Sequence, residues 1–151
     1  MNEKKNLTTK ETFDLAVQNH QKNNLQVAEK LYKKVLNINS NDLQSNFLLG
    51  TLSAQTKKFD IAKQLLNKVI QINPNHAATY NNLGLVFKQL GKNEKAVNCY
   101  QKAIEINPDN DRAHHKLGIV YFNLGLYATA IENYTKAIDI NPNKIEAYHG
   151  R

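Results

Sequence analysis

Tryptophan is absent from this chain, cysteine occurs once, and only three prolines and two arginines are present among 151 residues. The single Cys99 cannot form an internal disulfide, which fits a reducing cytoplasm. No apolar run approaches the roughly 20 residues that span a bilayer. The polar start Met1-Asn-Glu-Lys-Lys-Asn6 lacks the apolar stretch of a secretory signal. We therefore expect a cytoplasmic protein that does not insert into a membrane.

Motifs for chemistry are missing as well. The histidines show no i, i+4 pairing with a third ligand, which argues against a metal site; they are His20, His76, His114, His115 and His149. No base can be assigned to Cys99, so we interpret it as a structural thiol rather than a nucleophile. No glycine-rich phosphate loop and no paired-carboxylate motif is present. We expect no catalytic residue, no cofactor and no metal.

The formal net charge is +7, from 20 basic and 13 acidic residues. Nucleic-acid readers depend on arginine and on stacked aromatic side chains, whereas here the lysines are scattered and arginine is scarce. We interpret the positive charge as a solvated surface and expect no nucleic-acid partner.

An internal repeat organises the chain. The segment Tyr80-Asn-Asn-Leu-Gly84 recurs as His114-His-Lys-Leu-Gly118, 34 residues later. The segment from Ala96 to Pro108 recurs at the same interval as Ala130 to Pro142. After an extension at 1–8, the copies occupy 9–42, 43–76, 77–110 and 111–144, and a fifth opens at 145–151. A fixed period of this length indicates stacked repeats.

Each copy contains two helical patterns. In the third copy Tyr80, Leu83, Gly84 and Phe87 follow the spacing of one helix face, and a second such face follows after a turn. Gly91 and Gly125 supply the left-handed backbone that ends a helix, and Asn23-Asn24 and Lys57-Lys58 stand at the same place in the earlier copies. Asn-Pro pairs close the copies.

Small residues recur where the two helices of a hairpin must approach closely. They are Gly84 and Gly118, with Ala16 and Gly50 in register, and Ala28, Ala62, Ala96 and Ala130 on the second helices. One hairpin cannot bury its own apolar face, so neighbouring copies must stack. The predicted fold class is all-α, an α-α superhelix: a right-handed solenoid of antiparallel helical hairpins with a groove lined by the first helices.

These residues resemble the tetratricopeptide repeat family, whose pattern the third and fourth copies meet nearly in full. The second copy departs from it at Asn46 and Ser53. The first departs at Thr12, Asn19 and Ser40, which suggests a capping role. The resemblance covers residues 9–148 and implies a scaffold that holds a peptide in its concave groove and has no chemistry of its own.

The predicted groove residues come from the first helices of three copies. They are Phe47, Thr51, Asn81, Asn82, Leu85, Lys88, Arg112, His115, Lys116 and Ile119. Arg112, Lys116 and Asn82 suit an acidic or carboxylate-bearing peptide. They match only part of the clamp by which some relatives bind chaperone C-termini, because Phe47 and Thr51 replace two of its residues. The asparagine ladder of sugar-transferase arms is absent.

Three functions remain open from the sequence. The first is a scaffold that binds a protein or peptide in the groove. The second is the substrate-recruiting arm of a larger glycosyl-, sulfo- or methyltransferase. The third is self-assembly into homo-oligomers through uncapped ends, because no capping hairpin follows the fourth copy.

Overall fold

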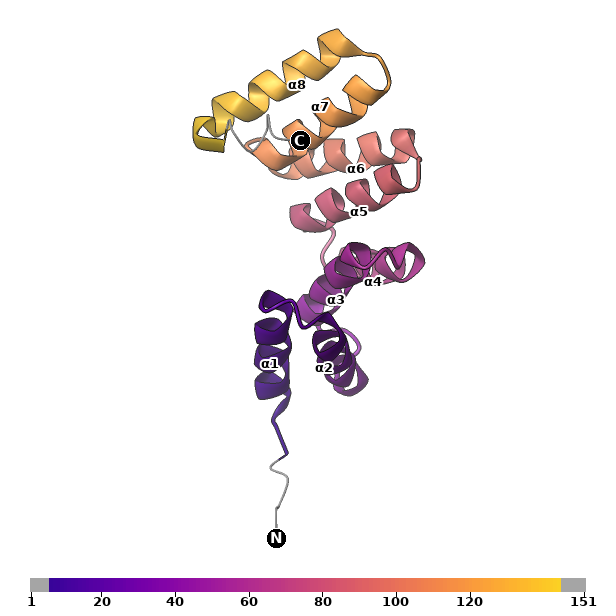
Figure 1. Cartoon of the computed structure of the whole chain (residues 1–151), viewed down its shortest axis with the longest axis vertical. Coiled ribbons are helices and arrows are strands. Elements are labelled where there is room, and N and C mark those ends of the chain that lie inside the picture. Colours follow the sequence, from indigo (N-terminus) through magenta and orange to yellow (C-terminus); the bar gives the residue numbers. More distant parts are fainter. Residues whose placement is uncertain (1–5, 145–151) are drawn as a thin grey trace. The chain divides into compact units, whose positions relative to one another are not determined.

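The computed structural model describes residues 6–144, and these residues fold into helices joined by turns, without a strand (Figure 1). The α-helices are α1 (Thr9–Gln21), α2 (Leu25–Ile38), α3 (Leu43–Gln55), α4 (Phe59–Ile72), α5 (Ala77–Gln89), α6 (Asn93–Ile106), α7 (Asp111–Asn123) and α8 (Tyr127–Ile140). A short 3-10 helix, η1 (Pro142–Lys144), follows. The predicted all-α class of helical hairpins is confirmed.

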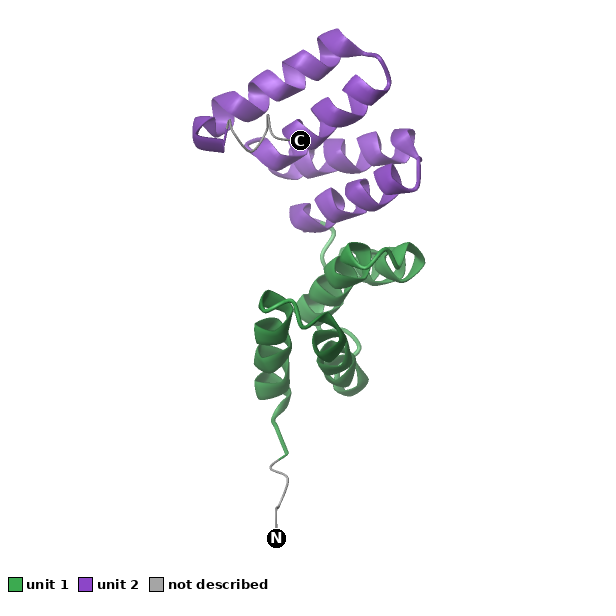
Figure 2. Cartoon of the chain, viewed as in Figure 1, with its two compact units in different colours: residues 1–74 green, residues 75–151 purple. Residues whose placement is uncertain are grey.

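The helices pair as α1 with α2, α3 with α4, α5 with α6 and α7 with α8. Only three residues join the two helices of each pair, and so short a connection forces neighbouring helices to run antiparallel. The chain divides into two compact units, residues 1–74 and 75–151 (Figure 2). The first unit holds α1 to α4 and the second α5 to α8.

The turns within the hairpins adopt the predicted left-handed backbone. Gly91 and Gly125 have φ of 75° and 80°, and Asn23 and Lys57 have 64° and 62°. Glycine adopts this region without strain and asparagine tolerates it, whereas a side chain such as that of Lys57 crowds the following carbonyl. The second hairpin therefore contains a locally strained residue that the third and fourth avoid.

The predicted close approach of the two helices is confirmed inside three hairpins. A Cβ atom added to Gly84 would lie 2.6 Å from Cε1 of Tyr100, and one added to Gly118 would lie 2.6 Å from Cδ1 of Tyr134. At Gly50 the nearest atoms belong to Leu66, at 2.9 Å. Each glycine thus accommodates the large side chain sixteen residues later on the partner helix.

The alanines expected at the close contacts of the second helices are buried. Ala28, Ala62 and Ala96 have no exposed surface, and Ala130 is 1% exposed. Ala96 and Tyr100 of α6 pack with Leu117 and Val120 of α7, so the core of the second unit continues from one hairpin into the next. This is the stacking that completes the burial of each apolar face.

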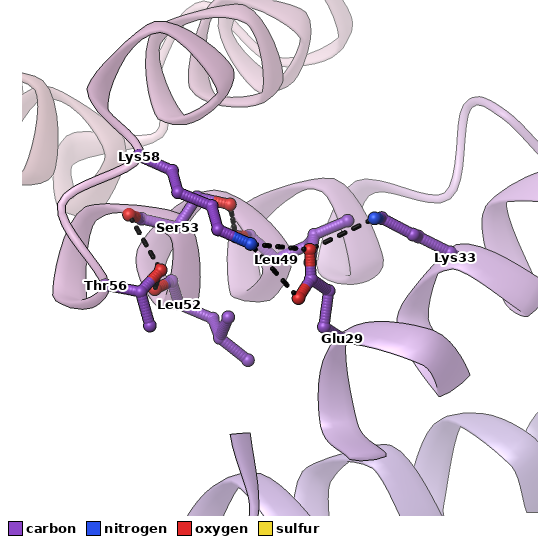
Figure 3. Close-up of polar contacts among 7 residues, drawn as sticks. All are labelled: Glu29, Lys33, Leu49, Leu52, Ser53, Thr56 and Lys58. Atoms are coloured by element: carbon purple, nitrogen blue, oxygen red, sulfur yellow. Dashed lines mark hydrogen bonds and ion pairs between the residues drawn. The ribbon is translucent and has the colours of Figure 1, made fainter. Parts of the chain in front are cut away.

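Polar residues at positions where the family has large apolar ones make local hydrogen bonds. Ser53 Oγ is buried and donates to the carbonyl oxygen of Leu49 at 2.7 Å (Figure 3). Asn46 Nδ2 donates to the carbonyl oxygens of Ser40 and Asp42, at 3.0 and 2.9 Å. A buried donor costs little once it is paired, so the hairpin tolerates these substitutions.

An ion pair connects the two hairpins of the first unit. Glu29 of α2 accepts from Lys58 Nζ at 3.2 Å and from Lys33 Nζ at 3.0 Å (Figure 3). The hydrogen bond from Lys33 is the main cause that lowers the pKa of Glu29 below its usual value, and the hydrogen bond from Lys58 adds to it. Partial burial of the carboxylate acts in the opposite direction but does not outweigh the two lysines. Lys58 precedes α4, so this contact links the start of α4 to α2.

The face of α1 that corresponds to the buried face of α3 is more polar. Glu11 and Gln18 occupy the register of the buried Ser45 and Leu52, and both are exposed. Leu15 is 37% exposed, whereas its counterpart Leu49 is 3% exposed. The capping role expected of the first copy stays a prediction.

Candidate functional site

The ten predicted groove residues lie on three helices in two units. Phe47 and Thr51 are on α3 in the first unit. The other eight are on α5 and α7 in the second unit: Asn81, Asn82, Leu85, Lys88, Arg112, His115, Lys116 and Ile119. Helix α5 contacts α7 directly, so the structure brings these eight onto neighbouring first helices of one unit.

The basic part of the site lies on α7. Arg112 is the second residue of the helix and is exposed, and Lys116 is half-buried one turn later. This i, i+4 spacing places both on one side of the helix. Asn82 on α5 is half-buried. The guanidinium and the ammonium can only donate hydrogen bonds, and the amide of Asn82 can donate as well as accept. Such a set of donors suits a carboxylate, which only accepts.

Asn81 has a positioning role that its register alone did not reveal. It is 7% exposed, and its Nδ2 donates to Oδ1 of Asn110 at 3.3 Å. Asn110 Oδ1 also accepts from the backbone N–H of Ala113 at 3.0 Å and so caps α7. Asn81 therefore ties α5 to the start of the helix that carries Arg112.

His115 is also almost fully buried, although its register predicts a residue on the groove surface. It is 8% exposed, and its ring lies 5.9 Å from the ring of Tyr134 on α8, centroid to centroid. Leu85, Lys88 and Ile119 are half-buried. The basic and amide side chains of this site that retain exposed surface are thus Arg112, Lys116, Asn82 and Lys88.

In the first unit the two predicted groove residues are half-buried and adjacent, since Thr51 Oγ1 donates to the carbonyl oxygen of Phe47 at 2.9 Å. The first unit also contains a cavity of about 310 Å³, and neither of these two residues lines it. It is lined by Thr9, Lys10, Phe13, Val35, Asp42 and Gln44. This cavity provides an apolar recess at the starts of α1 and α3.

Cys99 is half-buried on α6, and burial raises the pKa of its thiol to about 11. At neutral pH such a thiol is almost entirely protonated and a poor nucleophile. Within residues 6–144 no three His, Cys, Asp or Glu side chains gather as metal ligands would. No helix in that part of the chain has the length and apolarity needed to cross a membrane.

Three protein-family models match the chain. One described as "TPR repeat" matches residues 86–125, and one described as "Tetratricopeptide repeat" matches 112–144. A third, described as subunit 3 of the anaphase-promoting complex, or cyclosome, has repeats of the same type and matches 18–103, more than half of the chain. The chain belongs to the tetratricopeptide repeat family.

Solved structures of the same fold include MamA. One crystal structure of MamA is 24% identical in sequence, with a TM-score of 0.83 over 92% of this chain and 81% of that one. MamA from Desulfovibrio magneticus RS-1, from residue 41 to its end, is 22% identical, with a TM-score of 0.83 over 91% and 78% of the two chains. No curated protein sequence matches the chain significantly.

Family and fold together support the role of a protein-interaction scaffold for this tetratricopeptide repeat protein. Sequence analysis missed one feature of the second unit, a cavity beside His114 of α7. The sequence signal that could have revealed this cavity is His114 itself, a polar residue at the position that Tyr80 holds in the preceding copy.

Proposed function

We propose that this tetratricopeptide repeat protein binds an acidic or carboxylate-bearing peptide of a partner protein on the surface formed by α5 and α7. The observation that carries the proposal is the placement of Arg112 and Lys116 one helical turn apart on α7, next to α5 with Asn82. The half-buried Leu85 on α5 and Ile119 on α7 supply apolar area on the same two helices.

The arrangement favours carboxylates for a geometric reason. Guanidinium offers a planar fork of donors that matches the two oxygens of a carboxylate, and an ammonium on the same side adds a second charge. The hydrogen bond from Asn81 to Asn110 fixes the start of α7, so the Arg112 backbone is held in place before a ligand arrives. Preorganisation of this kind reduces the entropic cost of binding.

The test is binding of an acidic peptide with a free C-terminal carboxylate by the double variant Arg112→Glu/Lys116→Glu. We expect affinity to fall at least about tenfold, because two charge-assisted contacts become repulsive. Wild-type binding should also weaken as salt is raised from low to physiological concentration. Calorimetry gives the affinities, and circular dichroism checks that the variant remains folded.

A matched control uses the exposed Lys30 and Lys34, which are also four residues apart, on α2. Lys30→Glu/Lys34→Glu changes the net charge by the same amount, from +7 to +3, away from α5 and α7. We expect this control to bind almost as tightly as the wild type. Equal affinities of the two double variants would show that general charge, not this surface, attracts the peptide.

A further inference from the structure

A second cavity lies in the second unit, where the turn between α6 and α7 meets the end of α8. Its volume is about 420 Å³. Its apolar walls are Ile104 at the end of α6, Pro108 in the turn and Ile140 at the end of α8. None of the predicted groove residues lines it, so it is a separate surface of the hairpin pair.

Four polar side chains complete the lining: Asp109, His114, Lys136 and Asp139. Asp109, Lys136 and Asp139 are exposed, and none of the three side chains forms an ion pair within residues 6–144. With a neutral imidazole the lining carries a formal charge of −1 in a chain whose net charge is +7. The cavity is therefore a local acidic site on a basic protein.

His114 is the buried member of this set, 7% exposed. Its Nε2 lies 3.1 Å from the carbonyl oxygen of Pro108, which can only accept, so Nε2 carries the proton. Nδ1 is then a bare acceptor in the neutral ring, and it is buried without a hydrogen-bond partner in the described protein. An unpaired buried acceptor is costly, and a ligand donor would relieve that cost.

We propose that this cavity, the His114 cavity, binds the guanidinium group of an arginine side chain of a protein partner. The carboxylates of Asp109 and Asp139 accept from the planar fork, and His114 Nδ1 offers a third acceptor. Guanidinium is weakly hydrated and has five donors, whereas an ammonium has three and is strongly hydrated. The methylene stem of the arginine packs on Ile104, Pro108 and Ile140.

The experiment titrates the ¹⁵N-labelled chain with N-acetyl-L-arginine N-methylamide and follows backbone amide shifts by NMR. We expect saturable shifts at Asp109 and His114 below about 20 mM, a concentration that nearly fills a millimolar site. The neutral isostere N-acetyl-L-citrulline N-methylamide should leave both amides unshifted. No saturable shift with the arginine derivative, or equal shifts with citrulline, would overturn the proposal.

Two variants locate the binding. Asp139→Asn should weaken it about fivefold, the range of one partly exposed ion pair. The control Glu132→Gln removes the same charge from an exposed position on the same helix and should bind like the wild type. If Asp139→Asn also binds like the wild type, the cavity is not the site.

His114→Asn tests the imidazole while the fold is kept. In the first unit Asn46 occupies the same register and donates to the corresponding turn carbonyl, that of Ser40, so asparagine can replace the hydrogen bond to Pro108. We expect a normal unfolding midpoint and binding at least about threefold weaker. Unchanged binding would remove His114 from the site and refute the proposal as stated.

Free L-arginine distinguishes a protein side chain from a metabolite. It has the same guanidinium but adds an α-ammonium and an α-carboxylate, and the attraction of that carboxylate to Lys136 is offset by its repulsion from Asp109 and Asp139. We expect it to bind no more tightly than the blocked derivative. A preference for free arginine of about tenfold or more, or about 1.4 kcal/mol, would contradict a peptide ligand.

Discussion

Two tyrosines at the same register of the repeat should respond in opposite directions to the loss of their hydroxyl groups. Tyr32 and Tyr100 both have no exposed surface. The Tyr32 hydroxyl lies 3.0 Å from Nδ1 of His20, whose Nε2 donates to Oε1 of Gln55 at 2.8 Å. The Tyr100 hydroxyl is buried and has no hydrogen-bond partner in the described protein.

The expected magnitudes follow from these contacts. Because Gln55 Oε1 fixes the proton on Nε2, His20 Nδ1 accepts from the Tyr32 hydroxyl, and Tyr32→Phe loses about 1 kcal/mol of unfolding free energy. Tyr100→Phe removes a buried, unpaired hydroxyl whose desolvation costs about 1–3 kcal/mol, so we expect it to stabilise the fold by about 1 kcal/mol.

Urea unfolding followed by circular dichroism measures both changes. With a slope near 2 kcal/mol/M, the midpoints of the two variants should differ by about 1 M, one on each side of the wild type. Tyr127→Phe is the control, since Tyr127 is 58% exposed and its hydroxyl stays in water. Equal destabilisation by Tyr32→Phe and Tyr100→Phe would refute the reasoning.

Four further outcomes are expected. Lys57→Gly should raise the unfolding free energy by about 0.5–1 kcal/mol, because glycine adopts a φ of 62° without strain. Gly91→Ala should lower it by about 1 kcal/mol through its positive φ alone, since nothing lies within 4 Å of the added Cβ. Urea midpoints measure both changes. Cys99 should react with iodoacetamide at pH 8 about a hundredfold more slowly than a free thiol, because its pKa is about 11 instead of 9.0, and a rate like that of glutathione would contradict its burial. Burial raises the pKa of Tyr32 to about 12, so above pH 10 the unfolded chain loses a tyrosine proton that the folded chain still holds. The urea midpoint should therefore fall between pH 10 and pH 12, and it should fall less in Tyr32→Phe. If the exposed Tyr127 and Ile131 of α8 mediate self-association, light scattering should show a mass that rises with concentration and returns to the monomer in Ile131→Lys.

The helices and turns of this chain were predictable because their causes are local and repeat at a fixed interval. Glycine or asparagine at a left-handed turn, and a small residue opposite a large one, need no knowledge of distant contacts. Lys57 shows the limit of propensity, since the preference of lysine against a left-handed turn is overridden by the packing of its hairpin.

The surface was less predictable, because a register gives the side of a helix on which a residue lies but not what covers it. Asn81 and His115 have groove-facing offsets, yet Asn110 and Tyr134 enclose them. The His114 cavity depends on a turn, the end of α6 and the end of α8, which come together only in the folded unit. The ten residues of the predicted groove remain a prediction, of which the binding experiments test Arg112 and Lys116.

The fit between each glycine and the side chain it accommodates makes the whole hairpin, and not the single helix, the exchangeable part of this protein. Grafting α4 in place of α6 would set Leu66 over Gly84, where a tyrosine ring now fills the space, and the reverse graft would press that ring against Gly50. A gene shuffled at the boundaries between copies keeps every such match, whereas a crossover between the turns inside the second and third copies breaks it. Duplication of intact hairpins is therefore the route by which a sequence like this one can grow without losing its core.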